Sequence, residues 1–430
     1  MPVNLCCLRR VSMSFNLVEF LKSLVSLTVF DYVRQVWGDT PGVEIVLDII
    51  GVLVVSTFCL LIVIFLIWLE RKVIARIQDR IGPNRVGGRY GLLQTVADVL
   101  KLLTKEDITP AGADKVAYNL APLTIVMAAL LMWAVMPFAP GVIGVDLNVG
   151  VFYVMAVSSV SVVSLLLAGW GSNNKYALLG AFRSVAQLVS YEVPMILSLL
   201  IPILLARSMS TEQIIAAQDV PFIIMAPLSA LIFFISALAE TGRTPFDLLE
   251  AESEIVAGFH VEYGGMKFGM FFLAEFVSTL FMSGLFATLY LGGYRFFGLE
   301  NLVIGDMEIG RLLGLIVFFV KMFTIYFIFI WIRGTLPRVR VDQLLNFNWK
   351  FLVPVTLVLI LVVAILDKLA GGAGIWTRTV VQLVGNGVVG LVALELMRRA
   401  ARRYRREQEA MVMTRRELAS APAEVTVSSH

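Results

Sequence analysis

Eight apolar stretches, each close to the length needed to cross a bilayer, limit most strongly what this chain can fold into. A transmembrane helix needs about 20 mostly apolar residues, because the hydrocarbon core of a bilayer is about 30 Å thick. A helix also satisfies its own backbone hydrogen bonds in lipid. The sequence therefore predicts an all-α polytopic integral membrane protein. Its eight core helices are expected near 45–69, 117–137, 150–169, 186–206, 222–240, 268–292, 312–332 and 351–369.

The composition suits lipid better than water and bounds the chemistry of the chain itself. Of 430 residues, 58% are apolar and 16% charged, against roughly 45–50% and 25% in ordinary soluble domains. The net charge of +3 gives no indication of nucleic-acid binding. Three cysteines and two histidines lack the spacing and number for an iron–sulfur cluster, which needs about four ligands. We expect no metal site and no redox centre in this chain.

Lysine and arginine are distributed unevenly between the connectors, which predicts an orientation. The connector after the first apolar stretch, residues 70–115, is rich in them, whereas residues 138–149 contain neither. Positive residues are retained on the cytoplasmic side of a membrane. The N-terminus is therefore expected outside and the 70–115 connector in the cytoplasm.

A further apolar stretch, residues 376–397, is followed at once by six arginines within 398–406. With eight crossings this basic cluster would lie outside, against the positive-inside tendency, whereas a ninth crossing returns the C-terminus to the cytoplasm. A helix lying in the membrane interface is the alternative. The polar residues from 408 to 430 are expected to be disordered.

Residues 91–105 have an amphipathic pattern. Their apolar residues recur at helical spacing on one face, while Asp98, Lys101 and Lys105 fall on the opposite face. We expect a helix that lies on the cytoplasmic surface of the protein or of the bilayer.

Four glutamates stand inside or beside apolar stretches. Glu192 and Glu275 lie about two turns into the predicted fourth and sixth helices, and Glu70 and Glu240 end the first and fifth. A charge at the bilayer centre costs roughly 2.5–3.5 kcal/mol on insertion scales, so such groups usually face partners or cavities. These glutamates are candidates for a proton relay. Structural ion pairs or helix caps are the alternative.

Residues 241–267 form a connector in which acidic and apolar residues interleave. Asp247, Glu250 and Glu254 have the spacing of one helical face, and Glu252 lies between them. Four acids so close repel one another when all are ionised, so some should hold protons and titrate jointly. The apolar residues between them favour a buried acidic cluster over a solvated acidic loop.

Basic residues surround the turn Gly82-Pro83-Asn84. Arg71, Arg80 and Arg85 have the chemistry to bind a lipid phosphate, a partner subunit or another polar headgroup. Retention of topology is the alternative, and it explains most of these residues without any ligand.

A series of motifs, in order and with family-like spacing, resembles the H subunit of respiratory complex I, the proton-translocating NADH:quinone oxidoreductase. The resemblance covers roughly residues 44–369. It leaves out an N-terminal arm, 1–43, and an additional C-terminal helix with an Arg-rich end, 370–407. The matching motifs are Glu70-Arg71-Lys72, Arg80-Ile81-Gly82-Pro83-Asn84-Arg85, Ser172-Asn173-Asn174-Lys175-Tyr176, Ser190-Tyr191-Glu192, Arg243-Thr244-Pro245-Phe246-Asp247 and Leu336-Pro337-Arg338.

The resemblance implies a membrane subunit that forms a quinone tunnel and chamber and couples quinone reduction to proton translocation. It implies quinone as substrate, FMN and iron–sulfur clusters in partner subunits, and a place in the bacterial cell (inner) membrane among lipid and other complex I subunits. The chamber and tunnel residues that it implies are Glu70, Arg71, Arg80, Arg85, Asp247, Glu250, Glu252 and Glu254. The proton-coupling residues that it implies are Asp98, Glu192, Glu240, Glu262 and Glu275.

Two other functions fit parts of the pattern. The homologous membrane subunit of a hydrogenase or formate hydrogenlyase shares this ancestry, but the complete 70–85 segment and the full acidic loop favour complex I. A stand-alone secondary transporter would be expected to show internal repeats and paired broken helices, and the sequence indicates neither.

Overall fold

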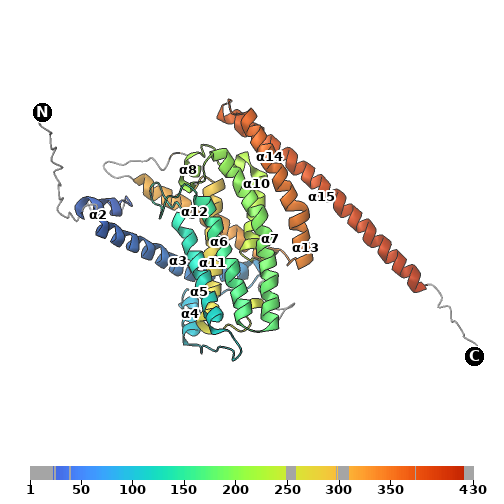
Figure 1. Cartoon of the computed structure of the whole chain (residues 1–430), viewed down its shortest axis with the longest axis horizontal. Helices are drawn as coiled ribbons and strands as arrows, with labels where there is room; N and C mark the ends of the chain where they lie inside the picture. The colour runs from blue at the N-terminus through green and yellow to red at the C-terminus, as the bar shows by residue number, and fades with distance from the viewer. Residues whose placement is uncertain are drawn as a thin grey trace, which may run out of the picture.

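Long apolar runs form long helices in this protein. The computed structural model describes residues 23, 26–37, 40–247, 258–296, 298, 309–372 and 374–420, with the side chains of the last range described as far as Arg399 and at Arg402. These ranges form helices joined by turns (Figure 1). The helices are α2 (Val29–Trp37), α3 (Pro41–Ile77), α4 (Gln94–Thr104), α5 (Lys115–Leu131), η1 (Met132–Val135), α6 (Gly150–Gly171), α7 (Lys175–Ala206), α8 (Thr211–Ala216), α9 (Phe222–Met225), α10 (Pro227–Glu240), η2 (Gly258–His260), α11 (Gly265–Tyr290), α12 (Ile309–Thr335), α13 (Val341–Phe347), η4 (Asn348–Leu352), α14 (Val353–Leu369) and α15 (Ile375–Ser420).

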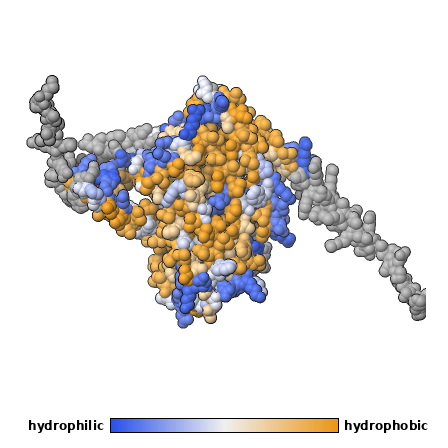
Figure 2. Space-filling view, in the orientation of Figure 1, coloured by the Kyte–Doolittle hydropathy of each residue, from blue (hydrophilic) through white to orange (hydrophobic). Residues whose placement is uncertain are grey.

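Eight helical segments in the described ranges are long and apolar enough to cross a membrane. Seven of them contain stretches that the sequence predicts as core spans, and the eighth is the first part of α15, Ile375–Arg399. In Figure 1, α4 lies at one end of the bundle and α8 at the other. Hydrophobic residues cover much of the side between these ends (Figure 2). The prediction of an all-α polytopic membrane protein is confirmed.

The predicted span 222–240 differs from the prediction, because it consists of two helices rather than one. The short α9 ends at Met225, and α10 begins at Pro227. Between them Ala226 has φ −132° and ψ 63°, outside the helical region. Proline has no N–H to continue a helix but is well suited to begin one. The result is a 14-residue apolar helix, α10, that ends at Glu240.

Small residues bring α5, α6 and α7 close together. A Cβ added at Gly169 of α6 would lie 2.4 Å from the Cβ of Ala181 in α7. A Cβ added at Gly171 would lie 2.7 Å from the backbone nitrogen of Tyr118 in α5. Close approach at small residues is a common way for helices to associate in membranes. This contact fixes α7, which carries Glu192, against its neighbours.

The C-terminal helix α15 is held to the bundle by polar side chains. Gln382 and Asn386 are each 1% exposed, and they donate hydrogen bonds to the carbonyl oxygens of Val363 in α14 and Met225 in α9. At the start of the helix, Nε of Arg378 donates to Asp367 over 2.7 Å. Three of the polar residues that weaken the apolar pattern of 376–397 are therefore the residues that attach this helix.

The helix α15 continues to Ser420, which corrects the prediction of disorder for the part of 408–430 that lies before 421. The segment 408–420 contains helix-forming residues such as Glu, Gln, Ala, Met, Arg and Leu, and neither glycine nor proline. Polar composition indicated disorder here, but helix propensity favours continuation of the helix that precedes it. Residues 421–430 lie outside the described ranges, as does most of the N-terminal arm.

Candidate functional site

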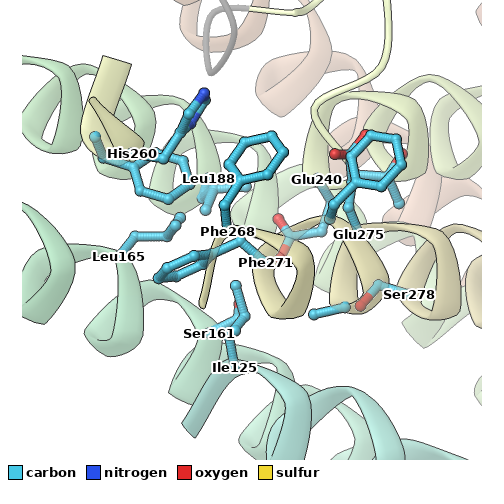
Figure 3. A pocket seen from close by; sticks show the side chains of 14 residues that line it. Ile125, Ser161, Leu165, Leu188, Glu240, His260, Phe268, Phe271, Glu275 and Ser278 are labelled. Carbon is cyan, nitrogen blue, oxygen red and sulfur yellow. The ribbon is translucent and has the colours of Figure 1, made fainter. Parts of the chain in front are cut away.

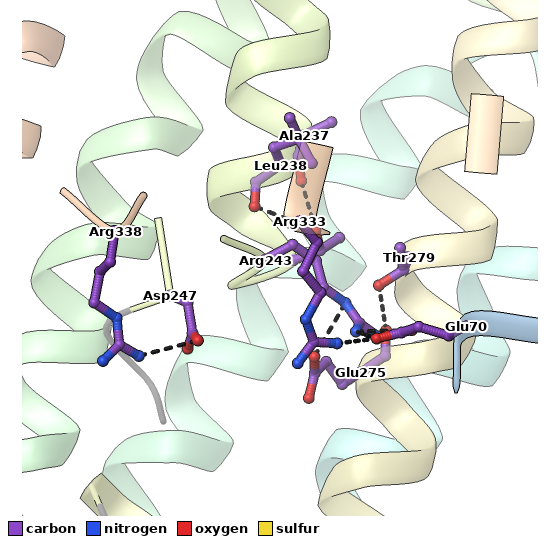
Figure 4. A network of polar contacts seen from close by, with 10 residues as sticks. Glu70, Ala237, Leu238, Arg243, Asp247, Glu275, Thr279, Arg333 and Arg338 are labelled. Carbon is purple, nitrogen blue, oxygen red and sulfur yellow. Dashed lines mark hydrogen bonds and ion pairs between the residues drawn. The ribbon is translucent and has the colours of Figure 1, made fainter. Parts of the chain in front are cut away.

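Two carboxylates, the buried Glu70 and the partly buried Glu275, share one arginine, Arg243 (Figure 4). Nη1 of Arg243 donates to both oxygens of Glu70, over 3.0 and 3.1 Å, and its Nε lies 3.2 Å from Oε1 of Glu275. Arg333 of α12 also donates to Glu70. Arg243 is 3% exposed and Glu70 6% exposed. Two guanidinium groups thus face two carboxylates, with Arg243 and Glu70 buried and Arg333 and Glu275 each 21% exposed.

A tight turn at the end of α10 positions Arg243. The N–H of Arg243 donates to the carbonyl oxygen of Leu238, and the N–H of Gly242 donates to that of Ala239. This pair of bonds is the Schellman arrangement that ends many helices, and it requires a left-handed residue just after the helix. Gly242 supplies that conformation, with φ +62°. The turn directs Arg243 back toward α3 and α11.

A cavity of about 90 Å³ lies beside this cluster (Figure 3). Glu240 and Glu275 line it on the side of the cluster, and His260 lies toward its other side. Oε2 of Glu240 is buried and has no hydrogen-bond partner among the described residues. Ser161 and other polar groups also line the cavity. A cavity of this size, with several polar groups on its wall, has room for more than one water molecule.

Glu192 lies on α7, the helix that packs against α10. Five residues before Glu192 in α7, the side-chain amide of Gln187 donates to the carbonyl oxygens of Ala239 and Phe246, each over 2.7 Å. This amide ties the end of α10 to the start of the following loop. The loop position is therefore mechanically linked to the helix that carries Glu192.

Asp247, the first acid of the predicted acidic cluster, pairs with Arg338 over 3.0 Å (Figure 4). The N–H of Val339 donates to the carbonyl oxygen of Pro245. The loop start therefore packs against the segment between α12 and α13. Three other members of the predicted cluster, Glu250, Glu252 and Glu254, lie outside the described residues.

Asp98 and Arg71 form a separate ion pair between α4 and α3. The amphipathic helix predicted for 91–105 is present as α4, and Asp98 on its polar face contacts the protein. Its apolar face is exposed, with Leu100 at 57% and Leu103 at 58%. Arg80 and Arg85 lie on the exposed connector before it. Of the predicted tunnel residues in 70–85, Glu70 is thus buried, whereas Arg80 and Arg85 lie on this outer surface.

Glu262 lies in a third environment. Its Oε1 accepts a hydrogen bond from Asn174, and its carbonyl oxygen accepts one from the hydroxyl of Tyr118. Tyr118 stacks on Tyr263, with ring centroids 4.2 Å apart. Burial raises the pKa of Tyr263, and its protonated hydroxyl donates to the carbonyl oxygen of Tyr118. Glu262 therefore joins α5 to the start of α7, close in sequence to the η2 residues that line the cavity.

The structure adds two residues to the predicted site, Arg243 and Arg333. Both occur in the sequence as connector or helix-end arginines, and neither is a predicted coupling residue. One signal in the sequence indicates that such arginines exist: a buried carboxylate is costly, so it requires a cationic partner somewhere in the fold. The sequence does not indicate which arginine serves.

Comparisons with known proteins place this arrangement in a family. The family model described as NADH dehydrogenase matches residues 50–364, which include every residue of the cluster. A protein of Dehalococcoides mccartyi, named as the H subunit of NADH-quinone oxidoreductase, is 50% identical over 308 residues, covering 71% of this chain and 83% of the relative. The protein of that name in Geobacillus kaustophilus is 50% identical over 297 residues, covering 69% and 86%. The one in Bacteroides thetaiotaomicron is 42% identical over 347 residues, covering 80% and 96%. The chain therefore belongs to the NADH dehydrogenase family, together with these H subunits of NADH-quinone oxidoreductases.

Proposed function

We propose that this multi-pass protein is the membrane subunit of an NADH-quinone oxidoreductase that forms the quinone chamber and couples quinone reduction to proton translocation. The names of the relatives favour this function over a hydrogenase subunit or a stand-alone transporter. The functional core is 44–369. NADH oxidation, FMN and the iron–sulfur clusters belong to partner subunits of the complex.

The observation that carries the coupling role is the position of Arg243 between Glu70 and Glu275, next to the cavity that contains Glu240. Arg243 and Asp247 both lie among the first residues of the loop that follows α10. Reduction of a quinone to a quinol takes up two electrons, which partner subunits deliver, and two protons. When acids of the chamber supply these protons, the chamber is left with more negative charge. When the loop moves in response, the charge of Arg243 is shared differently between Glu70 and Glu275.

A buried carboxylate that loses its guanidinium partner is left with an uncompensated charge, which is strongly unfavourable. Uptake of a proton removes that charge. Water in the cavity can deliver the proton, with Glu240 as the neighbouring acceptor and Glu192 next along α7. The chemistry that this chain supplies is therefore binding and transfer of protons, driven by a loop that responds to the quinone.

The quinone enters, in this proposal, along the outer surface made by α4 and the 81–93 connector. Ile81 is 77% exposed, Tyr90 64% and Leu103 58%. Such an apolar surface suits a lipid-soluble substrate. Exposed Arg80 and Arg85 at its edge are positioned to contact the headgroup of the quinone or a hydrophilic partner subunit.

Charge distribution and the packing of α15 support an orientation in the inner membrane with the N-terminus outside and the C-terminus in the cytoplasm. The start of α15 is tied by Arg378 to Asp367 at the end of α14, so α15 runs back across the bundle beside α14. We expect an Ala410→Cys variant, with Cys6, Cys7 and Cys59 replaced by serine, to react with a membrane-impermeant maleimide only in inverted vesicles. Reaction in intact spheroplasts alone would contradict a crossing of the membrane by α15.

Neutralising the cavity carboxylates tests the proposed function. In the intact complex reconstituted in proteoliposomes, Glu240→Gln and Glu275→Gln are expected to lower NADH-driven quinone reduction and proton uptake by about ten-fold or more, because each removes a proton-binding group. Glu212→Gln, in α8 at the opposite end of the bundle, is the matched control and should leave both unchanged. Fully assembled Glu240→Gln and Glu275→Gln complexes with normal rate and normal proton stoichiometry would exclude the coupling role.

A further inference from the structure

One side-chain amide inside the bundle holds two backbone positions of the candidate site. Gln187 of α7 is 1% exposed, and its Nε2 donates to the carbonyl oxygens of Ala239 and Phe246. Each of these carbonyl groups directly precedes an acidic residue, Glu240 in one case and Asp247 in the other. A carbonyl group and the Cα of the next residue belong to one planar peptide unit. Gln187 therefore fixes the two peptide units from which both acids extend.

Capping of α10 does not account for these two bonds. The carbonyl oxygen of Ala239 already accepts the N–H of Gly242 in the turn that ends the helix. The carbonyl oxygen of Phe246 belongs to the loop, not to α10. The two acceptors also determine which way the amide is turned, because only its nitrogen carries hydrogens to donate. Gln187 thus joins the end of α10 to the loop in addition to the bonds that end the helix.

Two buried oxygen atoms meet in sequence at this amide. Oε1 of Gln187 and Oε2 of Glu240 are both buried, and neither has a hydrogen-bond partner among the described residues. Glu240 lines the cavity, and so does Leu188, the residue after Gln187. A buried acceptor without a donor is costly. Proton exchange at Glu240 supplies an O–H donor, either as a water molecule or as the carboxyl proton.

We propose that Gln187 is a positioning residue for Glu240, which it holds at the cavity wall and connects to the loop start at Asp247. This inference rests on the proposed function, because it gives Gln187 a part in the same proton exchange. The amide itself transfers no proton. A displacement of the loop at Phe246 instead reaches Glu240 through a single side chain, since the same nitrogen holds the carbonyl group of Ala239.

The test replaces this amide with an apolar side chain of similar length in the intact complex. Gln187→Met is expected to lower kcat for NADH-driven quinone reduction by about five-fold or more, because two buried hydrogen bonds are lost. The KM for quinone and the reduction of ferricyanide by NADH, which partner subunits perform, should not change.

Gln218 offers a matched control at the α8 end of the bundle. It is 4% exposed, and its Nε2 also donates to two carbonyl oxygens, those of Ile214 and Thr288. Gln218→Met removes an equivalent pair of bonds far from Glu240 in the fold and should leave kcat unchanged in the assembled complex. An equal loss of kcat in Gln187→Met and Gln218→Met would overturn the proposal.

A double-variant cycle separates an action through Glu240 from general loosening of the fold. Effects of residues that act through one another are not additive. Gln187→Met should therefore cause no further loss of rate in a Glu240→Gln background, and the same fractional loss in both backgrounds would contradict the assignment. A slow Glu240→Gln complex beside a normal Gln187→Met complex would reject this inference alone. A normal Glu240→Gln complex would reject the proposed function.

Gln187→Glu serves in the same cycle if the methionine variant does not assemble. A protonated carboxyl group has the shape of the amide and keeps one of its two donated hydrogens. Its rate is expected to lie between those of the unmodified complex and Glu240→Gln, again with no added loss in the Glu240→Gln background. An additive loss would exclude a positioning role.

Discussion

Replacing Arg243 with glutamine is expected to have the largest effect of any single substitution in this chain. The variant leaves Glu275 without the guanidinium group that lies 3.2 Å away, and of the two arginines that pair with Glu70 among the described residues it leaves Arg333. Removing one partner of a buried ion pair destabilises a protein by about 3–5 kcal/mol, because the remaining charge stays buried. We expect little assembled complex in membranes, measured by immunoblotting of native gels, and at least ten-fold slower quinone reduction in what assembles.

The same cluster offers a rescue that separates charge balance from shape. In the double variant Arg243→Gln with Glu275→Gln, the uncompensated carboxylate is gone, so assembly should recover substantially. Quinone-coupled proton uptake should not recover, because a proton-binding group is still missing. Arg76→Gln, at an exposed position near the end of the helix that carries Glu70, is the control. Equal assembly of Arg243→Gln and Arg76→Gln would contradict the role assigned to the buried arginine.

Hydropathy predicts seven of the long helices because the apolar length of a segment is a local property of the sequence. The predicted span 222–240 shows the limit of prediction from hydropathy. Its mean apolar character is high, but Pro227 divides it, and the two parts form α9 and α10. The division matters for function, since it makes α10 a short helix whose end places Glu240 beside the cavity.

The polar residues of α15 lower its hydropathy in the sequence, but in the structure they attach the helix to the bundle. Gln382 and Asn386 lower the apparent hydropathy of 376–397 and leave an interfacial helix open as an alternative. In the fold they face carbonyl oxygens of Val363 and Met225. Those acceptors come from other helices, so no pattern within 376–397 indicates that the polar groups are satisfied.

The carboxylates of the site could be selected from sequence, because charge within an apolar stretch is costly and therefore conspicuous. The arginines that pair with these carboxylates could not be selected from the sequence. Arg243 and Arg333 lie 173 and 263 residues from Glu70 along the chain. The family resemblance groups Asp98 and Glu262 with the other coupling acids, but in the structure Asp98 pairs with Arg71 and Glu262 with Asn174. Which acids act together is a property of the packing.

Filling the cavity is expected to stop proton transfer while leaving both carboxylates in place. Ser161 of α6 lines the same cavity as Glu240 and Glu275 (Figure 3). A Ser161→Leu substitution puts an apolar side chain into the cavity space that water would occupy next to the two glutamates, so we expect NADH-driven proton uptake in proteoliposomes to fall by about ten-fold or more. Overpacking costs about 1–3 kcal/mol, which a large assembled subunit should tolerate.

Two control variants separate the filling of the cavity from the other effects of Ser161→Leu. Ser159 lies on the exposed side of the same helix, and its hydroxyl, like that of Ser161, donates to the carbonyl oxygen three residues earlier. Ser159→Leu therefore removes an equivalent hydrogen bond and adds the same side chain outside the cavity, and it should leave proton uptake unchanged. Ser161→Ala removes the hydroxyl without filling the space and should retain most of the activity. If Ser161→Leu pumps as well as Ser159→Leu in an equally assembled complex, protons do not pass through this cavity, and Glu240 must exchange them by another path.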